Sequence, residues 1–369
     1  MARKVKVGIV GCGVISGIYL ENLTKRFKNI EIVATMDLIR ERAENRAQQY
    51  NIPKVHDLED FYKDPEIELV VNLTTPQSHY DVDMRALNAG KHVYSEKPFA
   101  LNKKDGKEIV ALAKSKGLLA GCAPETFLGG GIQMCRKLID EGWIGTPVAA
   151  TAFMMGHGHE SWHPDPAFYY DFGGGPMFDM GPYYLTALVS MLGPVAKIAG
   201  ATKISFPTRT ITSEPKFGEI IDVKVPTYVT GTLTFKSGAI GTIITTFDVW
   251  DANLPNIEIY GSEGSLRVPD PNTFGGPVLY KKPGMKEWQQ IPVLFAHQEN
   301  SRGIGVSDMA LSIVNKRKHR VHGDMANHVL DIMCSIHDSS DSDKIITLDT
   351  TCERPAPFPL GLMDGILDE

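Results

Sequence analysis

A glycine-rich turn after a short apolar segment is the feature that most limits what this chain can fold into. Residues 5 to 10 form an apolar, β-branched run, and Gly11-Cys12-Gly13-Val14-Ile15-Ser16 follows in a G-x-G-x-x-S pattern. The first glycine permits a tight bend, and the second lets a pyrophosphate approach a helix N-terminus, whose N–H groups favour anions. A strand, this turn and a helix together predict the first unit of a dinucleotide-binding domain.

Strand-like and helix-like segments alternate along the first third of the chain. The strand candidates are residues 5–10, 30–36, 69–73, 92–94 and 118–120, and the helix candidates are 16–26, 40–50, 78–88 and 103–116. Gly90 and Gly117 stand just past two of these helices, where a left-handed C-cap favours glycine. We therefore predict an α/β fold with a doubly wound parallel sheet of Rossmann type, and place this domain at residues 1–123.

The pattern changes after Pro124. A helix is expected at 132–141, a glycine-rich and aromatic-rich loop at 156–175, strands at 227–235, 239–246 and 256–260, and an amphipathic helix at 324–337. We predict a second, sheet-rich domain over residues 124–369, whose C-terminal segment is able to pack back on the first domain. At roughly 150 residues per domain, two or three folding units are expected for 369 residues.

The composition excludes several classes of protein. A net charge of −6 does not attract phosphate backbones or anionic lipid, so neither nucleic acid nor membrane is an expected partner. No apolar run approaches the roughly 20 residues that cross a bilayer, and the N-terminus lacks the pattern of a signal peptide. The expected location is therefore cytoplasmic. Five cysteines without a C-x-x-C pair indicate reduced thiols rather than a disulfide framework or a cysteine zinc site.

The residue that ends the second strand candidate bears on the choice of cofactor. Asp37 lies 21 residues after Ser16, where a carboxylate can accept hydrogen bonds from the adenosine ribose hydroxyls. A carboxylate there also repels a 2′-phosphate, so NAD is the predicted cofactor. Arg40, three residues on, is able to receive such a phosphate and keeps NADP open. The alternative is a glycine turn with an unrelated surface aspartate.

The first catalytic candidate is Lys97 in the segment Glu96-Lys97-Pro98, which follows the fourth strand candidate. The carboxyl ends of the strands in doubly wound sheets are where ligands and reactive groups gather. Lys97 can hold a substrate hydroxyl, with a lowered pKa if it is desolvated beside a cationic nicotinamide. The plainer alternative is a solvated surface lysine, although Pro98 constrains the backbone next to it.

The second catalytic candidate is a glycine loop, Gly173-Gly174-Gly175, that is expected to open a helix. If the segment is helical, the four-residue spacing of Asp179 and Tyr183 places both side chains on one face, where the carboxylate can orient or polarise the phenol. The alternative is a helix start with buried aromatic residues.

A loop dense in histidine and tryptophan, residues 157–164, precedes the glycine loop. Trp162 offers a flat apolar face to the C–H surface of a ligand, and His159 and His163 offer hydrogen bonds to hydroxyls. The histidines and Glu160 also suggest a metal-binding site, since imidazole and carboxylate are good metal ligands. Their spacing matches no standard metal-binding motif, so we predict no metal. Structural histidines are a further alternative. The aromatic segment 168–171 is expected either to join the same cleft or to pack beneath the loop.

Several of these segments together resemble one enzyme family. Gly11-Cys12-Gly13, Glu96-Lys97-Pro98 and the Gly-Gly-Gly…Asp-x-Gly segment are similar to blocks of the Gfo/Idh/MocA family of glucose-fructose oxidoreductase and inositol dehydrogenase. Thr74-Thr75-Pro76 with His79, and the segment 138–145, resemble further blocks. The resemblance covers most of the chain. It implies a Rossmann domain followed by an α/β domain with a large, open, mainly antiparallel sheet that often mediates dimer or tetramer contacts.

The resemblance also implies functional residues. Lys97 and Asp179 match the family's catalytic lysine and aspartate, and Tyr183 stands where many members have the histidine that carries the proton; tyrosine occurs there in some relatives. The expected catalytic and substrate-binding residues are Lys97, His159, Trp162, His163, Asp179 and Tyr183. The expected cofactor-binding residues are Gly11, Gly13, Val14, Ile15, Asp37, Thr74, Thr75, Pro76, His79, Glu96 and Lys97.

The sequence thus predicts an NAD(H)-dependent oxidoreductase that moves a hydride between nicotinamide and a hydroxyl-bearing carbon of a sugar, glycoside or polyol, in a homodimer or homotetramer. Lys97 is expected to bind the hydroxyl, Tyr183 to carry its proton and Asp179 to orient both. Two alternatives stay open. One is an enzyme that cleaves glycosides through transient sugar oxidation by retained NAD, and the other is a non-catalytic cofactor-binding sensor.

Overall fold

The first half of the fold is a parallel sheet covered by helices. A computed structural model of the chain describes residues 3–368. Six parallel strands lie in the order β3-β2-β1-β4-β5-β6. Their bounds are β1 Val5–Val10, β2 Ile30–Met36, β3 Lys54–Val55, β4 Leu69–Asn72, β5 His92–Ser95 and β6 Ala120–Cys122. The central strands are almost entirely apolar and buried, as a sheet covered on both faces requires.

The helices of this half alternate with the strands as the sequence predicts. They are α1 Ser16–Lys25, α2 Arg40–Tyr50, α3 Leu58–Lys63, α4 His79–Asn88 and α5 Lys103–Ser115, with a 3₁₀ turn at Pro76–Ser78. The predicted doubly wound sheet is therefore confirmed. β3 and α3 are not predictable from the sequence, because a two-residue strand and a six-residue helix are too short to show a hydrophobic period.

The second half of the fold is built on a nine-stranded sheet in the order β16-β15-β14-β13-β7-β12-β11-β8-β17. Only β7 and β12 pair in parallel, so the predicted mainly antiparallel sheet is confirmed. The strands are β7 Pro147–Met155, β8 Val195–Lys203, β11 Tyr228–Phe235, β12 Ile240–Thr246, β13 Ile257–Gly261, β14 Ser265–Val268, β15 Val278–Lys281, β16 Gln289–Ile291 and β17 Ile346–Thr347.

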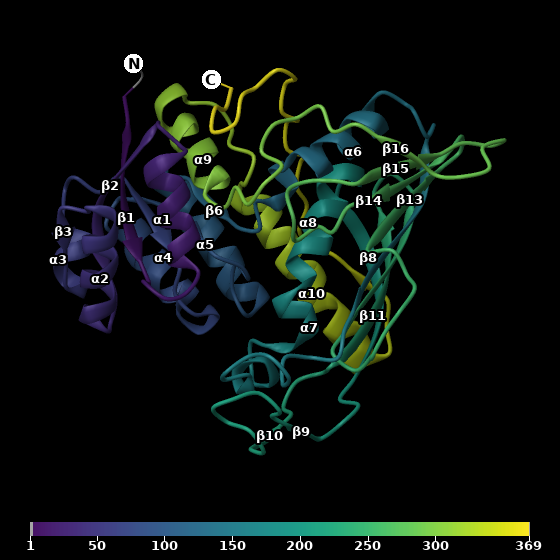
Figure 1. Cartoon of the computed structure of the whole chain (residues 1–369), viewed down its shortest axis with the longest axis horizontal. Coiled ribbons are helices and arrows are strands. Elements are labelled where there is room, and N and C mark those ends of the chain that lie inside the picture. The colour runs from purple at the N-terminus through teal and green to yellow at the C-terminus, as the bar shows by residue number, and fades with distance from the viewer. Residues whose placement is uncertain (1–2, 369) are drawn as a thin grey trace.

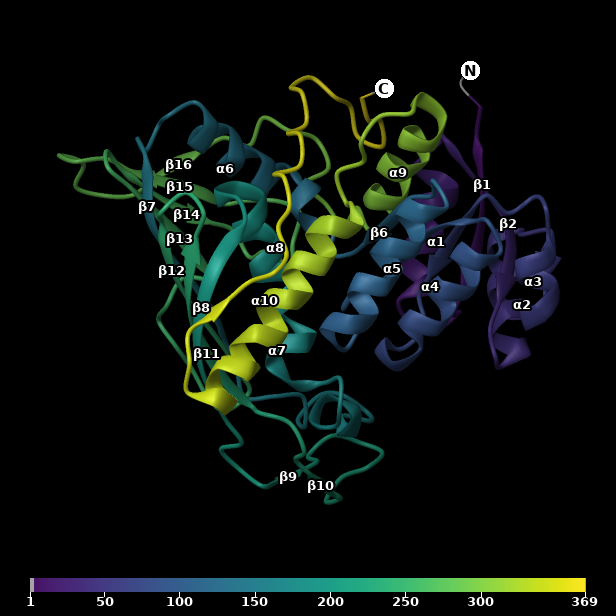
Figure 2. The same cartoon turned by 180° about the vertical axis from the view of Figure 1, so that it is seen from behind.

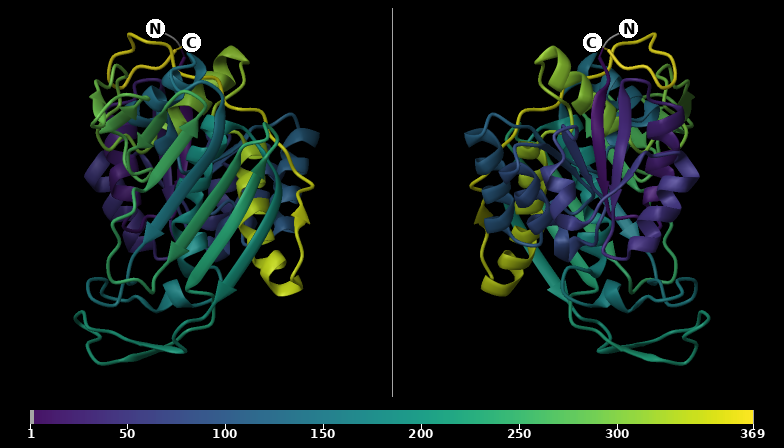
Figure 3. Two further views of the ribbon diagram at one scale, coloured as in Figure 1. Left: turned by 90° about the vertical axis from the view of Figure 1, so that its right-hand side faces the viewer. Right: turned by 90° about the vertical axis from the view of Figure 1, so that its left-hand side faces the viewer.

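Helices cover one face of this large sheet and leave the other open. They are α6 Gly130–Asp140, α7 Gly175–Asp179, α8 Gly181–Leu192 and α10 Gly323–Ser342, with 3₁₀ turns at Thr126–Leu128 and Ala167–Tyr170. A further helix, α9 Ile304–Asn315, packs against the Rossmann sheet instead. α8 and α10 lie between the sheet and the Rossmann domain (Figure 1). The opposite face of the sheet carries no helix (Figure 3, left).

The last third of the chain returns to the Rossmann domain. α9 packs against β1 and β6, and α10 packs against α5 as well as against α8 and β8. The C-terminal segment runs beside α9 (Figure 2), where Asp364 pairs with Arg26 of the first domain. The two halves therefore share one continuous hydrophobic core.

A small two-stranded arm extends from the C-terminal domain, below the large sheet in Figure 1. It consists of β9 Thr208–Thr210 and β10 Ile220–Asp222. A separate apolar cluster joins this arm to the histidine-rich loop, with the fully buried Tyr170 packed against Ile211, Ile221, Val223 and Phe247. The loop that carries the substrate-binding candidates is thus anchored from below.

Candidate active site

The predicted cofactor residues lie at one edge of the Rossmann sheet, because all six strands are parallel and end there. The glycine turn follows β1, Asp37 follows β2, residues 74–76 follow β4, and residues 96–98 follow β5. This is the edge at which doubly wound sheets bind ligands. The sequence placed these segments correctly because each stands directly after a strongly apolar strand.

The glycine turn has the shape that a pyrophosphate requires. Gly11 has φ +91°, and a Cβ atom there would lie 2.7 Å from the carbonyl oxygen of Leu73. At Gly13 a Cβ would meet nothing within 4 Å, so the space above the turn is open. Val14 is 97% exposed beside it. The open space, with the N-terminus of α1 next to it, fits a dinucleotide phosphate.

The serine at the third position of the fingerprint stabilises the turn through hydrogen bonds. Ser16 Oγ donates a 2.7 Å hydrogen bond to the carbonyl oxygen of Gly13, and the guanidinium of Arg46 reaches the same oxygen at 3.2 Å and Ser16 Oγ at 3.1 Å. Arg46 was not predicted as a site residue. It lies on α2, and nothing in its local sequence marks it as a support for a turn thirty residues earlier.

Asp37 is held at the turn by two backbone groups. Its carboxylate accepts hydrogen bonds from the backbone N–H of Cys12 at 2.7 Å and of Ile39 at 2.8 Å. A carboxylate has about four acceptor sites, so capacity for ribose hydroxyls remains. Arg40, the alternative receptor for a 2′-phosphate, is paired with Glu44 at 2.8 Å and with Asp57 at 2.7 Å.

The side chain of His79 lies inside the protein rather than at the surface of the cofactor edge. It is fully buried, and its ring nitrogens lie 2.7 Å from the carbonyl oxygen of Pro98 and 3.0 Å from that of Thr74. His79 therefore joins the loops after β4 and β5, whereas the exposed Thr75 and the half-buried Pro76 present surface to solvent. Burial lowers the pKa of His79.

Lys97 and Asp179 form the centre of the candidate site. Lys97 Nζ donates hydrogen bonds to the carbonyl oxygen of Asp179 at 2.6 Å and to its carboxylate Oδ1 at 2.9 Å, and both side chains are more than four-fifths buried. Burial opposes the charge of Lys97, but Asp179, Tyr183 and Glu96 outweigh it and raise the lysine pKa above its usual value. Direct contact with the Asp179 carboxylate thus favours the charged ammonium, and a lowered pKa beside a bound cationic nicotinamide stays a prediction.

The carboxyl of Asp179 shows the matching effect. Burial opposes its ionisation, but the charge of Lys97, with a contribution from His159, lowers its pKa below the usual range. The pair is therefore an ammonium beside a carboxylate in a mostly buried setting. Glu96 stands just behind it, where its carboxylate accepts a 2.7 Å hydrogen bond from the buried phenol of Tyr19.

The shared helix face of Asp179 and Tyr183 was expected on the condition that one helix holds both, and that condition is not met. α7 ends at Asp179 and α8 begins at Gly181, with Met180 between them. Lys97 Nζ lies 5.2 Å from the centre of the Tyr183 ring, above its face. Burial raises the pKa of the Tyr183 phenol, and the charges of Lys97 and Arg302 offset this only in part.

The histidine-rich loop brings one imidazole to Asp179. His159 Nε2 lies 3.5 Å from Asp179 Oδ2, and the imidazole stacks on Tyr169 with ring centres 3.6 Å apart and planes 7° apart. Trp162 is 62% exposed with its ring 5.2 Å from that of His159. His163 packs edge-on against Tyr169. The sequence left open whether the segment 168–171 joins the cleft or packs beneath the loop. Tyr169 joins the cleft by its contact with His159, and Tyr170 packs beneath the loop.

The other members of this loop face away from Asp179. Glu160 is buried and pairs with Arg209 at 3.1 Å, and His157 stacks on Trp250 with ring centres 3.3 Å apart. Among residues 3–368, no group of three histidine, cysteine, aspartate or glutamate side chains is arranged to hold a metal ion. Within the same residues, no helix is long and apolar enough to cross a membrane.

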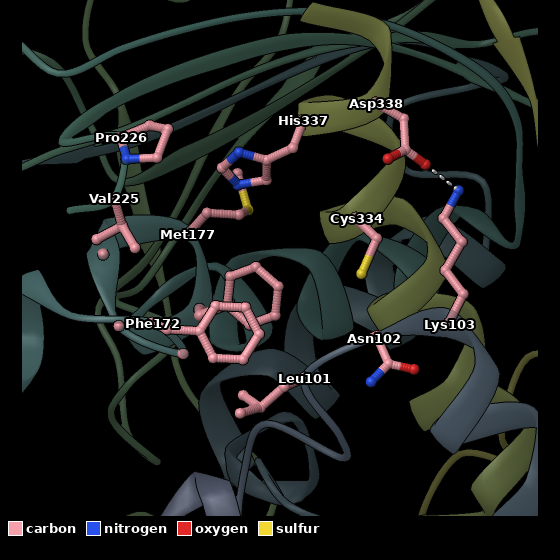
Figure 4. Close-up of a pocket in the computed structure, with 14 residues that line it drawn as sticks. Leu101, Asn102, Lys103, Phe172, Met177, Val225, Pro226, Cys334, His337 and Asp338 are labelled. Atoms are coloured by element: carbon pink, nitrogen blue, oxygen red, sulfur yellow. Dashed lines mark ion pairs between the residues drawn. The ribbon is translucent and has the colours of Figure 1, made fainter. Parts of the chain in front are cut away.

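A separate cavity of about 400 Å³ opens beside the glycine loop (Figure 4). Its lining is mostly apolar, and the Lys103–Asp338 ion pair of 2.6 Å lies at its side. The main apolar lining residues are Leu101, Phe172, Met177, Phe178, Val225 and Pro226. Lys97, Asp179 and Tyr183 are not among the lining residues, so this cavity is distinct from the candidate site.

A Rossmann domain with this edge, joined to an open-sheet domain that supplies Asp179, defines a two-domain NAD-binding oxidoreductase fold. Residues 5–123 match the family model described as "Oxidoreductase family, NAD-binding Rossmann fold", and residues 132–267 match the "GFO/IDH/MocA C-terminal domain". The chain belongs to the Gfo/Idh/MocA oxidoreductase family, as its sequence motifs predict.

Curated relatives match over part of their length. An inositol 2-dehydrogenase/D-chiro-inositol 3-dehydrogenase of Lactiplantibacillus plantarum is 35% identical over 156 residues, which is 40% of this chain and 43% of that protein. A 1,5-anhydro-D-fructose reductase of Ensifer adhaerens is 34% identical over 124 residues, which is 33% of this chain and 37% of the relative. The aligned regions thus span less than half of these relatives.

Solved structures match over nearly the whole fold. A levoglucosan dehydrogenase in complex with NADH and L-sorbose gives a TM-score of 0.80 at 18% identity, with 94% of this chain and 100% of that chain covered. An NAD binding oxidoreductase from Klebsiella pneumoniae gives a TM-score of 0.82 at 19% identity and covers 94% of this chain and 99% of its own. At such identities the likeness shows the fold.

Proposed function

We propose that the protein is an NAD(H)-dependent oxidoreductase that transfers a hydride between nicotinamide and a hydroxyl-bearing carbon of a sugar, glycoside or polyol. The observation that carries the proposal is the Lys97–Asp179 pair, because it sets a buried ammonium at the dinucleotide-binding edge of the sheet. The names of the curated relatives, which act on inositols and an anhydro sugar, support the same substrate class.

The pair suits the oxygen of a carbinol or carbonyl group. An ammonium that stays charged donates a strong hydrogen bond to that oxygen and stabilises negative charge that develops on it. Asp179 keeps Lys97 charged and fixes its direction, since the carboxylate and the backbone carbonyl of the same residue both accept from Nζ. When bound, NAD supplies the hydride acceptor at this edge. Trp162 offers an exposed aromatic face to the sugar.

NAD is the proposed cofactor rather than NADP. Asp37 presents a negative charge where the adenosine ribose is expected, and a 2′-phosphate would be repelled there. Both Arg40 contacts to acidic side chains would have to break before its guanidinium met a phosphate. NADP therefore remains the weaker alternative.

We further infer a homodimer or homotetramer assembled through the uncovered face of the nine-stranded sheet. By strand alternation and register, this face carries Ile240, Ile244 and Phe153 among threonines. Apolar surface of this kind is typical of subunit contacts. The proposed location is the cytoplasm.

The first test is a titration of the purified protein with NADH and, separately, with NADPH, followed by nicotinamide fluorescence. We expect NADH to bind more tightly than NADPH, and Asp37→Ala to weaken NADH binding by about tenfold or more, the loss of roughly one charge-assisted hydrogen bond. Equal binding of both cofactors by the wild type and by Asp37→Ala contradicts the assigned role of Asp37.

The second test is turnover on a panel of myo-inositol, glucose, 1,5-anhydrofructose and levoglucosan, with both NADH formation and sugar products measured. Lys97→Ala is expected to lower kcat/KM by roughly 10²-fold or more. Lys103→Ala is the matched control, since Lys103 lies outside the site and pairs with Asp338. Glycoside cleavage without NADH accumulation selects the glycoside-cleaving alternative, and cofactor binding without turnover on any sugar favours the sensor.

A further inference from the structure

The geometry points to His159 as the group that exchanges the substrate proton in the proposed reaction. This inference rests on the proposed oxidoreductase function and deepens it. It assigns to a histidine of the loop before α7 the task that sequence comparison places on Tyr183 of α8. The chemistry required is general base catalysis during oxidation of a hydroxyl and general acid catalysis during reduction of a carbonyl.

The imidazole is close enough to act on the same oxygen as Lys97. Asp179 lies between them, with Oδ1 bonded to Lys97 Nζ at 2.9 Å and Oδ2 located 3.5 Å from His159 Nε2. The second distance exceeds that of an ordinary hydrogen bond, so Nε2 is not committed to the carboxylate. A hydroxyl held by Lys97 next to this carboxylate therefore comes within reach of Nε2.

The surroundings hold the ring in one orientation. His159 is 9% exposed, stacks face to face on Tyr169, and meets the ring of Phe247 edge-on with centres 4.8 Å apart. Its Nδ1 is buried and has no hydrogen-bond partner within the described part of the chain. A buried imidazole with one unpaired nitrogen and one facing a carboxylate is costly in a purely structural role, because unpaired buried polar atoms destabilise a fold.

Tyr183 is less suited to the same task. Lys97 Nζ lies 5.2 Å from the centre of its ring, and burial raises the pKa of the phenol above its ordinary value near 10. With a raised pKa the phenol stays protonated near neutral pH, so hardly any phenolate is present to accept the substrate proton. The geometry instead makes the tyrosine ring a cation–π support for Lys97.

The step balances as follows. In oxidation, the C–H bond breaks and its electron pair leaves as hydride to NAD, the C=O bond forms, and the hydroxyl proton passes to His159 Nε2. The imidazolium then returns the proton to water. In reduction, the C–H bond would form with a hydride from NADH, the C=O π bond would break, and protonated His159 would give its Nε2 proton to the oxygen.

Activity of His159→Ala, measured on the best substrate of the panel, tests the assignment. We expect kcat/KM to fall by roughly 10²- to 10⁴-fold, and added imidazole to restore part of it. The fall of kcat/KM for oxidation toward low pH, which is the acid limb of the pH profile, should also disappear. The charged or titratable groups near this ring are Asp179 on α7, Lys97 after β5, and Tyr169 and His163 on the loop, and all of them remain in the variant.

His157→Ala is the matched control, because it removes an imidazole from the same loop that stacks on Trp250 instead of facing Asp179. Imidazole is expected to rescue His159→Ala and not His157→Ala. Tyr183→Phe keeps the ring over Lys97 and is expected to keep the acid limb. NADH fluorescence titration of each variant shows whether the fold and the cofactor site remain intact.

A measurement independent of turnover uses the protein without cofactor. The ring nitrogen signals of His159 in ¹⁵N spectra, assigned by their loss in His159→Ala, should shift when myo-inositol or the best panel substrate is added. The assignment is overturned if His159→Ala turns over substrate at the wild-type rate, or if Tyr183→Phe alone loses activity and the acid limb. Absence of turnover in the wild type on every sugar counts against the proposed function instead.

Discussion

At the scale of single residues, two glycines of one motif have different physical tasks. Gly11 adopts a left-handed conformation with the backbone of the β4 loop against its α-carbon, whereas Gly13 has open space above it. The sequence predicts both glycines from the fingerprint, but which of them the fold itself requires depends on how closely residues 73 and 74 approach. That approach is a tertiary contact, and it leaves no local signal.

The two glycines therefore predict opposite outcomes for the same substitution. Gly11→Ala is expected to destabilise the protein by about 1–3 kcal/mol or more, because its φ of +91° is costly for alanine and the new methyl group meets Leu73. Gly13→Ala is expected to leave the unfolding temperature of the cofactor-free protein unchanged and to weaken NADH binding. Thermal unfolding with and without NADH checks both, and a loss of stability in Gly13→Ala contradicts this division.

Residue motifs also show where sequence reasoning stops. Lys97 and Asp179 were predictable because each belongs to a recognisable block. The approach of His159 to Asp179 was not, since it depends on the path of a loop that Tyr170 and the arm anchor from below. The sequence indicated only a histidine-rich loop of use to a sugar.

At the scale of elements, the break between α7 and α8 has a physical cause that the sequence contains. Proline lacks the N–H of an i→i−4 hydrogen bond, so Pro182 favours the first turn of a new helix and disfavours the continuation of an earlier one. The structure has Pro182 in the first turn of α8 and Pro176 in the first turn of α7. The four-residue spacing of Asp179 and Tyr183 places them on one face only within an unbroken helix, and Pro182 disfavours that continuity.

A buried polar cluster joins three elements beneath the cofactor edge. Asp83 on α4 accepts a 2.8 Å hydrogen bond from Asn72 Nδ2 at the end of β4 and a further one from the hydroxyl of Ser95 at the end of β5. Burial raises the pKa of Asp83 to about 7, and the hydrogen bonds from Ser95 and Asn72 offset this only in part. The stability of the fold is therefore expected to depend on pH through Asp83.

The sign of that dependence follows from the two states. An unfolded aspartate titrates near pH 4, so between about pH 4 and pH 7 the folded protein holds a proton that the unfolded chain releases. Asp83 thus makes the protein less stable as pH rises through this window, by at most about 4 kcal/mol. Asp83→Asn is expected to remove this part of the slope. Urea unfolding of both proteins at pH 4.5, 5.5, 6.5 and 7.5 measures this slope. If the free energy of unfolding changes with pH equally in both proteins, Asp83 is not the group responsible.

At the scale of the whole molecule, the Rossmann domain is completed by a helix that comes from much later in the chain. The motifs place a Rossmann domain at residues 1–123, and its six strands lie there. Yet α9, near residue 310, packs against β1 and β6, with Ile304, Met309 and Ala310 fully buried. An apolar helix near the C-terminus carries no sign of the sheet that it covers, so sequence reasoning missed α9 and its place.

This construction predicts that residues 1–123 do not fold alone, since the fragment exposes the apolar surface that α9 covers. The isolated fragment should bind a hydrophobic dye, show poor dispersion of its NMR signals and fail to bind NADH. The same fragment joined by a flexible linker to residues 301–322 should gain native-like dispersion, and the version with Met309→Asp should not. The full chain should unfold in a single transition, because one core spans both halves. Cooperative unfolding and NADH binding by residues 1–123 alone would show that α9 is dispensable for the first domain.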